Sequence, residues 1–332
     1  MKVTSKNPKI LITGAGGFIG GHLVKHFLAR GYRQIRAVDI KPLSDWHQLS
    51  EGVENQSLDL QNLDNCRQVV VGVDEVYNLA ADMGGMGYIE THKALCMLNV
   101  LINTHLLLAA RDAGVQRYFY ASSACVYSQA KQKSANIKGL RESDAYPADP
   151  EDGYGWEKLF AERMCRHFME DFGLEVRVAR FHNVYGPQGE YQGGREKAPA
   201  AIIRKVLEAK SSGRHEIEIW GDGEQSRTFM YIDDCVKGID MIMHSDIWEP
   251  INLGTSELVT INRLVSLVEE IAAIKLKRRY KLDAPKGVRG RSSDNTLLKK
   301  YLDWEPSISL HEGMKKTYEW IEGEMKKNAK GR

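Results

Sequence analysis

The sequence predicts an α/β fold: a Rossmann-type doubly wound parallel sheet with a smaller, mostly C-terminal α/β lobe. In the first half, short β-rich runs such as KILITGA, QIRAVDI and RYFYASS alternate with helical patterns of ten or more residues. This alternation is typical of βαβ units and a parallel sheet. Several helical patterns end at glycine (Gly31, Gly114 and Gly173), which adopts the left-handed C-terminal conformation without strain. After about Phe181, glycine, proline and charged residues divide the chain into loops, which indicates a second unit.

The expected domain boundaries follow from this change of pattern. We expect residues 1–180, with a return segment at about 226–248, to form the Rossmann domain. Residues from about 181–225 and 249–332 are expected to form the lobe that closes over it. A chain of 332 residues suits one large α/β domain or two fused ones.

Composition and charge argue against several classes of protein. A formal charge of +2 provides no basic field for nucleic acid or a membrane surface, so neither partner is expected. The N-terminus is polar, and no run approaches the roughly 20 apolar residues that span a bilayer. The ten histidines lack ligand spacing and no C-x-x-C occurs, so we expect no metal. An odd number of scattered cysteines favours a reducing cytoplasm; they are Cys66, Cys96, Cys125, Cys165 and Cys235.

A glycine-rich turn, ITGAGGFIG, lies between the first strand-like run and the first helical pattern. Glycines at positions 14, 17 and 20 permit a tight turn and a close backbone approach, by which a helix N-terminus binds a pyrophosphate. The pattern therefore predicts a dinucleotide site, although a purely structural glycine turn would look the same. The expected cofactor-binding residues are Gly14, Gly17, Phe18, Ile19, Gly20, Asp39, Asp59, Leu60, Ala80, Tyr154 and Lys158.

Two carboxylates bear on which dinucleotide binds and how it is held. Asp39 ends the second strand about 20 residues after the last glycine, where it can bond the adenosine ribose hydroxyls. Its charge would repel a 2′-phosphate, which favours NAD over NADP. Lys41 lies close by in the sequence, and its positive charge is an argument for NADP. Asp59 follows the third strand, where it either meets the adenine edge or caps a loop.

Tyr154 and Lys158 are four residues apart in DGYGWEKLF, so they project from one face of a helix. Such pairs are common by chance, and this one gains weight from the cradle and the serines before it. A lysine ammonium beside the phenol, near a cationic nicotinamide, would lower the pKa of Tyr154 from about 10. Tyr154 would then act as a general base on a substrate hydroxyl that Ser123 holds.

The glycine cradle, NLAA at Asn78, SSACVY, the Tyr154/Lys158 pair and WGDGEQSRTFMYIDD occur in this order. Together they resemble the extended short-chain dehydrogenase/reductase family over nearly the whole chain. The resemblance implies that the first domain binds NAD, that the smaller lobe binds a nucleotide sugar, and that Ser123 is the catalytic serine. Relatives are commonly homodimers, so we expect a homodimer.

Cys125 occupies a diagnostic position in SSACVY. The 4,6-dehydratases of the family have a glutamate there, and 4-epimerases normally have a threonine or a similar residue. Free cysteine more often packs as a small hydrophobe than it reacts. A thiol can nevertheless exchange a proton near neutrality when a cation lies close by. On the residues alone, both interpretations of Cys125 stay open.

Five local matches resemble one group within the family, the GDP-mannose 3,5-epimerases: DMGGMGY, ASSAC, RFHNVYGP, REKAPAA and GVRGRSSDN. By its implication Cys125 and Lys197 are the acid/base pair that inverts two sugar carbons. The expected substrate-binding residues are Gly84, Gly85, Ser123, Asn183, Glu196, Lys197, Lys205, Gln225, Arg227 and Arg291. For the diphosphate, the pairs Arg289/Arg291 and Lys205/Arg227 are candidates, each with the alternative of a solvated surface charge.

The resemblance thus predicts an NAD-dependent nucleotide-sugar epimerase with GDP-mannose as its substrate. Transient oxidation at C4 by bound NAD makes C3 and C5 acidic, Cys125 and Lys197 exchange protons there, and re-reduction gives GDP-L-galactose, with GDP-L-gulose as a second product. The alternatives are another GDP-sugar or GDP-heptose epimerase, or a nucleotide-sugar 4-epimerase. A non-catalytic NAD-binding sensor would show damage at Ser123, Tyr154 or Lys158, which are all intact.

Overall fold

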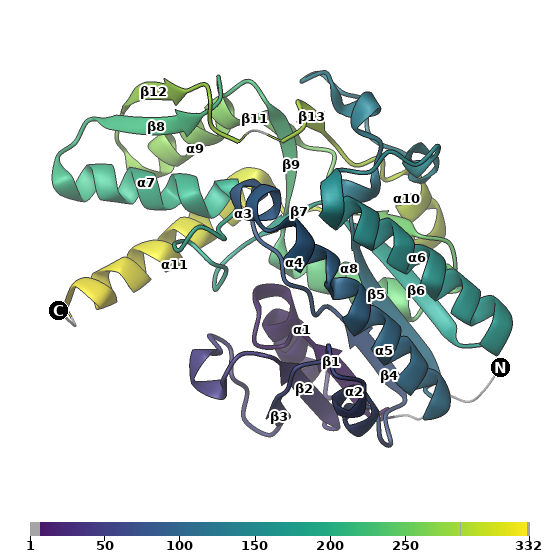
Figure 1. Cartoon of the computed structure of the whole chain (residues 1–332). Helices are drawn as coiled ribbons and strands as arrows, with labels where there is room; N and C mark the ends of the chain where they lie inside the picture. Colours follow the sequence, from purple (N-terminus) through teal and green to yellow (C-terminus); the bar gives the residue numbers. More distant parts are fainter. Residues whose placement is uncertain (1–6, 286, 331–332) are drawn as a thin grey trace.

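The computed structural model describes residues 7–285 and 287–330, and its centre is a seven-stranded parallel sheet (Figure 1). The strand order is β10-β6-β5-β4-β1-β2-β3, with every neighbouring pair parallel. This confirms the predicted doubly wound sheet. The strands are β1 (Ile10–Thr13), β2 (Ile35–Asp39), β3 (Glu54–Ser57), β4 (Glu75–Asn78), β5 (Arg117–Ser123), β6 (Glu175–Phe181) and β10 (Ile251–Leu253).

Helices cover both faces of this sheet, so most of its strands are apolar throughout. Alternate residues of β1 join different cores: Ile10 and Ile12 face the first, and Leu11 faces the second. The first core lies beneath α1 (Phe18–Ala29) and α8 (Ile232–Met243), which pack on each other. The second lies beneath α2 (Leu63–Val69), α5 (Asn99–Asp112) and α6 (Asp152–Phe172).

The strand order reverses between β1 and β4, because the chain runs outward to β3 and then crosses back. In open parallel sheets, ligands bind in the crevice beyond the carboxyl ends of the strands at such a switch point. The glycine-rich turn follows β1 directly at this place. The topology therefore places the predicted cofactor site where the physics of the fold favours one.

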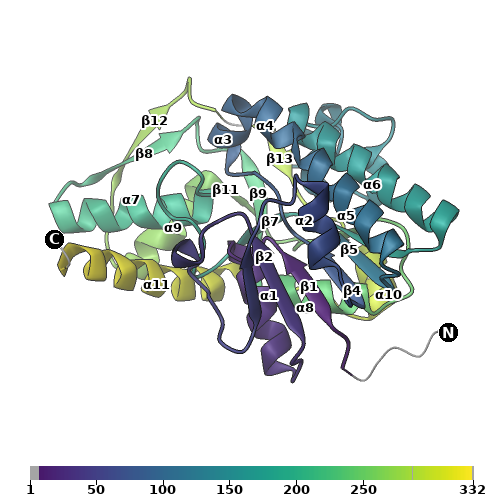
Figure 2. The same ribbon diagram turned by 60° about the horizontal axis from the view of Figure 1, so that its bottom comes forward.

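The smaller lobe contains a four-stranded and a two-stranded sheet with helices packed beside them. Its helix α7 (Ala198–Ser212) contacts both α9 (Ile261–Ala272) and α11 (Leu310–Lys330), and Figure 2 shows α7 and α11 side by side. The strands of this lobe are β7 (Asn183–Tyr185), β9 (Ser226–Tyr231), β11 (Leu258–Thr260) and β13 (Gly290–Arg291), and β8 (Glu216–Trp220) with β12 (Lys277–Lys281). The remaining elements are α3 (Met86–Thr91), α4 (Lys93–Met97), α10 (Thr296–Leu302) and the 3₁₀ turns Leu43–Asp45, Ala124–Val126, Gln129–Gln132 and Glu142–Ala145.

Two strands lie on the other side of the predicted boundaries. β9 falls in the expected return segment, yet it pairs with β7, β11 and β13 of the small lobe. β10 falls in the expected lobe, yet residues 251–253 pair with residues 179–181 of β6 at the edge of the large sheet. The segment that returns to the large sheet is therefore α8 with β10. The division into a cofactor domain and a substrate lobe stays a prediction.

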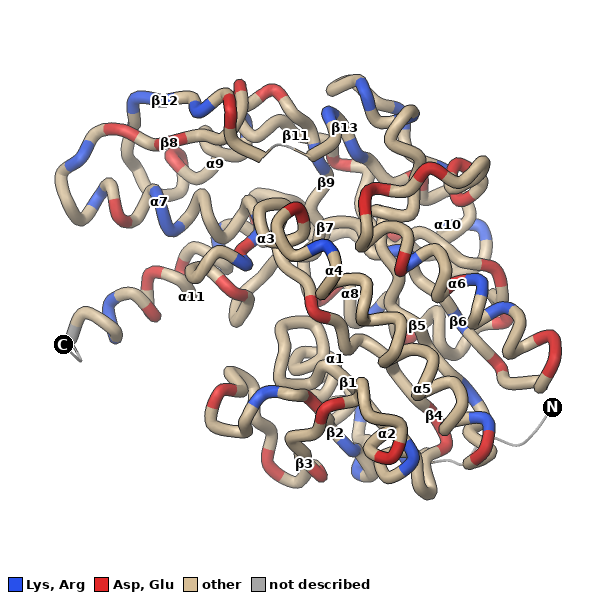
Figure 3. Tube along the Cα trace, in the orientation of Figure 1, with Lys and Arg blue, Asp and Glu red and all other residues tan. Residues whose placement is uncertain are grey.

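One apolar segment corrects the sequence analysis. Among the described residues, the run Lys93–Asp112 is long and apolar enough to cross a membrane by length and composition. Here it is interrupted between α4 and α5, and α5 packs against α2 and α6. A core helix meets the same criterion, so this is weak evidence for a membrane span. Figure 3 shows Lys and Arg interspersed with Asp and Glu over both lobes.

Candidate active site

The glycine-rich turn forms a cradle that admits no side chains. Gly14 has a φ of +70°, and a Cβ there would lie 2.8 Å from the Leu79 carbonyl oxygen at the end of β4. A Cβ on Gly20 would lie 2.2 Å from the Gly14 carbonyl oxygen. Helix α1 begins after Gly17 with no capping side chain and no acidic residue in its first turn. Its free amide groups and positive dipole end suit the pyrophosphate of a dinucleotide.

The ends of β1 and β4 are held together beside this cradle. Thr13 Oγ1 accepts hydrogen bonds from the backbone N–H of Leu79 and of Ala80, each at 3.2 Å. It donates to Asn78 Oδ1 at 3.0 Å. These bonds position the backbone of Ala80, one of the predicted cofactor contacts, at the rim of the switch point.

Asp39 lies at the end of β2, as predicted. Its side chain is buried, and Oδ1 accepts a hydrogen bond from the backbone N–H of Lys41 at 3.0 Å. The Lys41 ammonium lies 3.6 Å from Glu190 Oε1 of the small lobe. Lys41 thus has an acidic partner of its own, which agrees with the preference for NAD.

Of the two roles predicted for Asp59, the structure shows the capping of its own loop. Its Oδ1 accepts the backbone N–H of Gln61 at 2.8 Å, and its side chain is exposed. The next residue, Leu60, is buried. The adenine contact predicted for Asp59 stays a prediction.

The predicted hydride-site residues come together where β5 ends and α6 begins. Ser123 is the last residue of β5, and its Oγ accepts the backbone N–H of Cys125 at 3.2 Å. Tyr154 and Lys158 are both buried on α6, with the Lys158 ammonium 5.6 Å from the centre of the Tyr154 ring. Burial raises the pKa of Tyr154 well above its ordinary value, and Cys125 and Glu157 act in the same direction. The predicted lowering of the Tyr154 pKa by Lys158 is therefore not seen in the protein alone.

The Lys158 ammonium instead belongs to a buried polar group that the sequence analysis missed. It donates to the Tyr120 hydroxyl at 3.1 Å and lies 3.7 Å from Glu157 Oε2. Tyr120 donates in turn to Glu157 Oε1 at 3.2 Å. Burial raises the pKa of Glu157, while Lys158 and Tyr120 oppose that shift. These contacts hold the Lys158 ammonium in place near the Tyr154 ring.

Cys125 lies in a short 3₁₀ turn after β5, and it is 7% exposed. The Arg291 guanidinium, from β13, reaches it across 166 residues of sequence: Nη1 lies 3.5 Å from Cys125 Sγ. Arg291 Nη2 donates to Glu151 Oε2 at 2.5 Å and Nε donates to Gln132 Oε1 at 2.7 Å. Burial raises the pKa of the Cys125 thiol, Glu151 adds to the rise, and Arg291 opposes it. The cation in contact with the thiol is thus Arg291.

Lys197 stands at the N-cap of α7 and acts electrostatically on Cys125. Burial lowers the pKa of the Lys197 ammonium, and Arg291 lowers it further, whereas Cys125 opposes the shift. The fold thus brings together the two residues that the resemblance pairs, although 72 positions separate them in the sequence.

The candidates for the diphosphate separate into buried and exposed groups. Arg227 of β9 is buried beside Arg291, to which it is paired in register. Burial lowers the pKa of Arg227 to about 10, and the neighbouring Arg291 contributes. Arg289, in contrast, is half-exposed and contacts both Asp222 carboxylate oxygens at 2.8 Å. Arg227 and Arg291 thus form a buried pair of guanidinium groups, whereas Arg289 belongs to an exposed ion pair.

Three other predicted residues have specific positions in the small lobe. The Lys205 ammonium donates to the Glu218 carbonyl oxygen at 3.0 Å and lies 5.8 Å from the centre of the Trp220 ring. Asn183 Nδ2 donates to the Thr228 carbonyl oxygen at 3.0 Å. Gln225 Nε2 donates to the Trp220 carbonyl oxygen at 2.8 Å, and its buried Oε1 has no hydrogen-bond partner among the described residues. The Gln225 oxygen is therefore available to a ligand donor.

The loop before α3 contacts the loop before α7. The Gly85 N–H donates to the Arg195 carbonyl oxygen at 3.0 Å, and a Cβ on Gly85 would lie 2.6 Å from the Glu196 carbonyl oxygen. A Cβ on Gly84 would meet Tyr88 Cβ at 2.8 Å. The Glu196 carboxylate pairs with Arg204 at 3.1 Å. The Tyr88 side chain therefore requires glycine at position 84, and the backbone of Glu196 requires it at position 85. The predicted approach of these glycines to the sugar stays a prediction.

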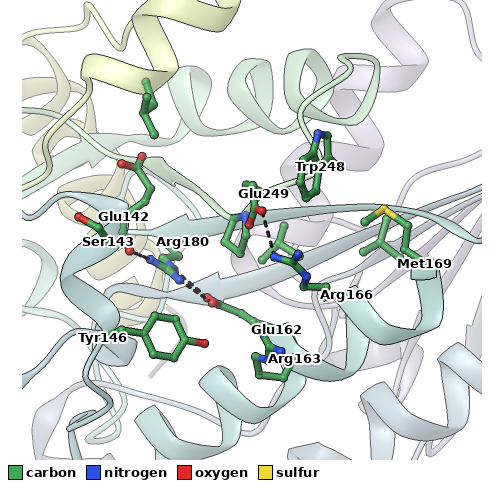
Figure 4. A pocket seen from close by; sticks show the side chains of 14 residues that line it. Glu142, Ser143, Tyr146, Glu162, Arg163, Arg166, Met169, Arg180, Trp248 and Glu249 are labelled. Atoms are coloured by element: carbon green, nitrogen blue, oxygen red, sulfur yellow. Dashed lines mark hydrogen bonds and ion pairs between the residues drawn. The ribbon is translucent and has the colours of Figure 1, made fainter. Parts of the chain in front are cut away.

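A cavity of about 300 Å³ lies elsewhere, between α6 and β6 (Figure 4). Figure 4 shows Arg180 bound to Glu162 and Arg166 bound to Glu249 at this cavity. None of Ser123, Cys125, Tyr154, Lys158 or Lys197 lines it. Among the described residues, no group of three or more His, Cys, Asp or Glu side chains could hold a metal ion.

A Rossmann-type sheet, a glycine cradle at its switch point, and a serine at a strand end beside a buried Tyr/Lys pair define a nicotinamide-dependent enzyme. The chain belongs to the NAD dependent epimerase/dehydratase family, whose sequence model matches residues 10–254. NAD is its cofactor, as the sequence predicts.

The sequence relatives indicate which group within the family this chain resembles. The chain is 44% identical to GDP-mannose 3,5-epimerase 1 of Oryza sativa subsp. japonica, over 97% of this chain and 84% of that protein. It is equally 44% identical to GDP-mannose 3,5-epimerase of Arabidopsis thaliana, over 98% of this chain and 86% of the relative. The predicted resemblance is confirmed.

Solved structures share the fold. Thermotoga maritima UDP-glucose 4-epimerase with UDP-glucose has a TM-score of 0.85 at 26% identity, covering 95% of this chain and 99% of that chain. Bacillus cereus UDP-glucuronic acid 4-epimerase, in complex with UDP-glucuronic acid and NAD, has a TM-score of 0.81 at 25% identity, with the same coverage.

Proposed function

We propose that this enzyme is a nucleotide-sugar epimerase of the GDP-mannose 3,5-epimerase type, which converts GDP-mannose to GDP-L-galactose and GDP-L-gulose. The observation that supports the proposal is that Cys125 packs in one cluster with Tyr154 and lies within electrostatic range of Lys197. A 4-epimerase needs no second pair of proton carriers. The relatives with 44% identity carry the same activity in their names.

The chemistry divides between two sets of residues. Bound NAD would supply the hydride chemistry at C4 of the sugar, an oxidation followed by a re-reduction. Ser123 holds the C4 hydroxyl, and Tyr154 takes its proton as a general base once a bound cationic nicotinamide offsets the burial that raises the pKa of Tyr154. The resulting C4 ketone makes the hydrogens on C3 and C5 acidic, because either carbanion is stored as an enolate. Cys125 and Lys197 then exchange protons at these carbons, one residue removing a proton from one face and the other delivering one to the opposite face.

The substrate's diphosphate is assigned to the buried guanidinium groups of Arg227 and Arg291. Both are under 10% exposed, and charge-assisted hydrogen bonds are strongest where water is excluded. Asn183, Glu196, Lys205 and Gln225, with the backbone of Gly84 and Gly85, are proposed to complete the substrate contacts. Arg289 is left out because its side chain is half-exposed, in an ion pair with Asp222 outside this buried pair.

The test is incubation of the NAD-loaded enzyme with GDP-mannose in deuterium oxide. We expect deuterium at C3 and at C5 of the sugar, and new products inverted at these carbons. Absence of deuterium at both carbons contradicts the proposal. Inversion at C4 without solvent deuterium supports the 4-epimerase alternative, which the similarity to UDP-glucose 4-epimerase favours. A GDP-heptose or another GDP-sugar turned over faster than GDP-mannose identifies a different substrate.

We also propose a homodimer formed through α4, α5 and α6, which lie side by side in Figures 1 and 2. Large apolar side chains on these helices are between 36% and 53% exposed: Leu95, Met97, Leu98, Leu101, Trp156 and Phe160. Such a cluster is typical of a protein interface. Light scattering should give the dimer mass for the wild type and a monomer mass after Trp156→Glu and Phe160→Glu. For localisation we propose the reducing cytoplasm, since all five cysteines are free.

A further inference from the structure

The side chain of Arg195 connects two loops that are far apart in the sequence. Arg195 lies two residues before Lys197, the N-cap of α7, and its guanidinium reaches the loop between β4 and α3 and α3 itself. Nη1 donates to Asp82 Oδ1 at 2.7 Å and to the Met83 carbonyl oxygen at 3.2 Å, and Nη2 donates to the Tyr88 hydroxyl at 2.7 Å. These contacts cross 107 to 113 residues of sequence, and the proposed mechanism uses none of them.

The planar guanidinium suits this position in two ways. Its central carbon lies over the Tyr88 ring, 3.9 Å from the ring centre, at a distance typical of a cation–π contact. Its two terminal nitrogens bond a carboxylate and a phenol that also bond each other, since the Tyr88 hydroxyl donates to Asp82 Oδ2 at 2.9 Å. A lysine ammonium has the charge but neither the plane nor the fork. The geometry is therefore specific to arginine.

Backbone contacts bring the loop before α7 against the start of α3 (Figure 1). The Gly85 N–H donates to the Arg195 carbonyl oxygen at 3.0 Å. Asp82 is fixed in turn, because its backbone N–H donates to Asn99 Oδ1 at 2.7 Å and its carbonyl oxygen accepts from Asn99 Nδ2 at 3.1 Å. Asn99 is buried and is the first residue of α5. Arg195 thus binds a loop that is anchored on the large domain.

The chain just before Arg195 is not confined by packing. Gly193 and Gly194 have φ values of +90° and +87°, which L-residues rarely adopt, and a Cβ on either would lie in open space. On the α7 side, Glu196 accepts the Gly194 N–H at 2.7 Å and pairs with Arg204 at 3.1 Å. These contacts hold the loop to its own helix, and the Arg195 side chain holds it to the loop after β4.

The partners of Arg195 also contact the proposed catalytic residues. Met83 and Tyr88 pack against the apolar cluster that contains Cys125 and Tyr154. One end of the Arg195 contact therefore touches the Cys125 side of the site. The other end leads, two residues later, into Lys197 at the start of α7.

We propose that Arg195 is a positioning residue: it ties the loop that leads into Lys197 to the loop that packs on Cys125 and Tyr154, and so sets the distance between the two proton carriers. This inference rests on the proposed function and deepens it, because inversion requires an acid and a base on opposite faces of one sugar ring. A displacement of about 1 Å in such a placement can lower the rate about 10²-fold.

Hydrogen exchange of the NAD-loaded protein without substrate, followed by mass spectrometry, tests the tie. Arg195→Met should make the amides of residues 82–88 and 193–197 exchange about tenfold faster or more, with α5 unchanged. Arg263→Met is the matched control, because Arg263 also forms an exposed ion pair, with Glu270 at 2.8 Å, but inside α9. Exposed pairs contribute little to the free energy of unfolding, so both variants should fold.

Deuterium incorporation from GDP-mannose tests the positioning. Arg195→Met should lower kcat for incorporation at C3 and C5 by about tenfold or more, with KM changed less than about threefold. The transient of reduced nicotinamide should remain, because oxidation at C4 depends on Tyr154 and does not require Lys197. Arg195→Lys keeps the charge without the fork and the stacked plane, and should recover only part of kcat.

Equal exchange in Arg195→Met and the wild type overturns the proposal, and so does the same acceleration in Arg263→Met. A rise in KM at unchanged kcat also overturns it, because Arg195 would then bind substrate. Full recovery by Arg195→Lys would show that charge alone matters and overturns the positioning role. If the wild type incorporates no deuterium, the proposed function fails, while the exchange experiment still decides whether Arg195 ties the two loops.

Discussion

Replacing Arg291 with methionine should destabilise the protein in a pH-dependent way. The Arg291 guanidinium is 5% exposed and uses its nitrogens on Glu151 at 2.5 Å, Gln132 at 2.7 Å and Cys125 at 3.5 Å. Methionine fills a similar volume but leaves the Glu151 carboxylate buried without its cation. Removing one partner of a buried ion pair costs about 3–5 kcal/mol of the free energy of unfolding.

The sign of the pH dependence follows from Glu151. In the wild type, Arg291 holds the pKa of Glu151 below its ordinary value, so the carboxylate contributes stability above its unfolded pKa of about 4.3, and this is lost as pH falls. In the variant, burial raises the pKa of Glu151 above the unfolded value. The variant is then weakest at high pH and recovers as Glu151 takes up a proton. The difference in stability should be larger at about pH 8 than at about pH 5.

Urea unfolding at both pH values measures this difference. Arg289→Met is the matched control, because Arg289 pairs with Asp222 at 2.8 Å but both side chains are more than a third exposed. Exposed pairs contribute about 0–1 kcal/mol. Adding Glu151→Gln to Arg291→Met should restore part of the loss. The reasoning is refuted if Arg291→Met costs no more than Arg289→Met, or costs the same amount at both pH values.

Three further outcomes test the site. Cys125→Ala should reduce deuterium incorporation at C3 and C5 by about 10²-fold or more while NAD remains bound. An active variant would show that Cys125 only packs as a small apolar side chain. Tyr154→Phe should remove the transient absorbance of reduced nicotinamide on mixing with GDP-mannose, whereas a normal transient would exclude Tyr154 as the base. Gly20→Ala places a Cβ 2.2 Å from the Gly14 carbonyl oxygen, so it should weaken NAD binding measured by calorimetry; unchanged affinity would show that the cradle is not the cofactor site.

Sequence alone determined the features whose physics is local. A glycine cradle between a strand and a helix must form a backbone turn with close contacts, and Gly14 and Gly20 show this. An aspartate that ends the second strand lies at the carboxyl edge because strand direction is shared in a parallel sheet, as Asp39 confirms. Tyr154 and Lys158 share a helix face because they are four residues apart.

Only the tertiary structure decided which charges face each other. Arg291 meets Glu151 across 140 residues and Cys125 across 166 residues, and no spacing or periodicity encodes either contact. The buried group of Tyr120, Glu157 and Lys158 likewise needs β5 and α6 to pack before it exists. Local pattern depends on backbone geometry over a few residues. The protonation state of a thiol depends on burial and on every charge within a few ångströms, and folding alone brings those charges together.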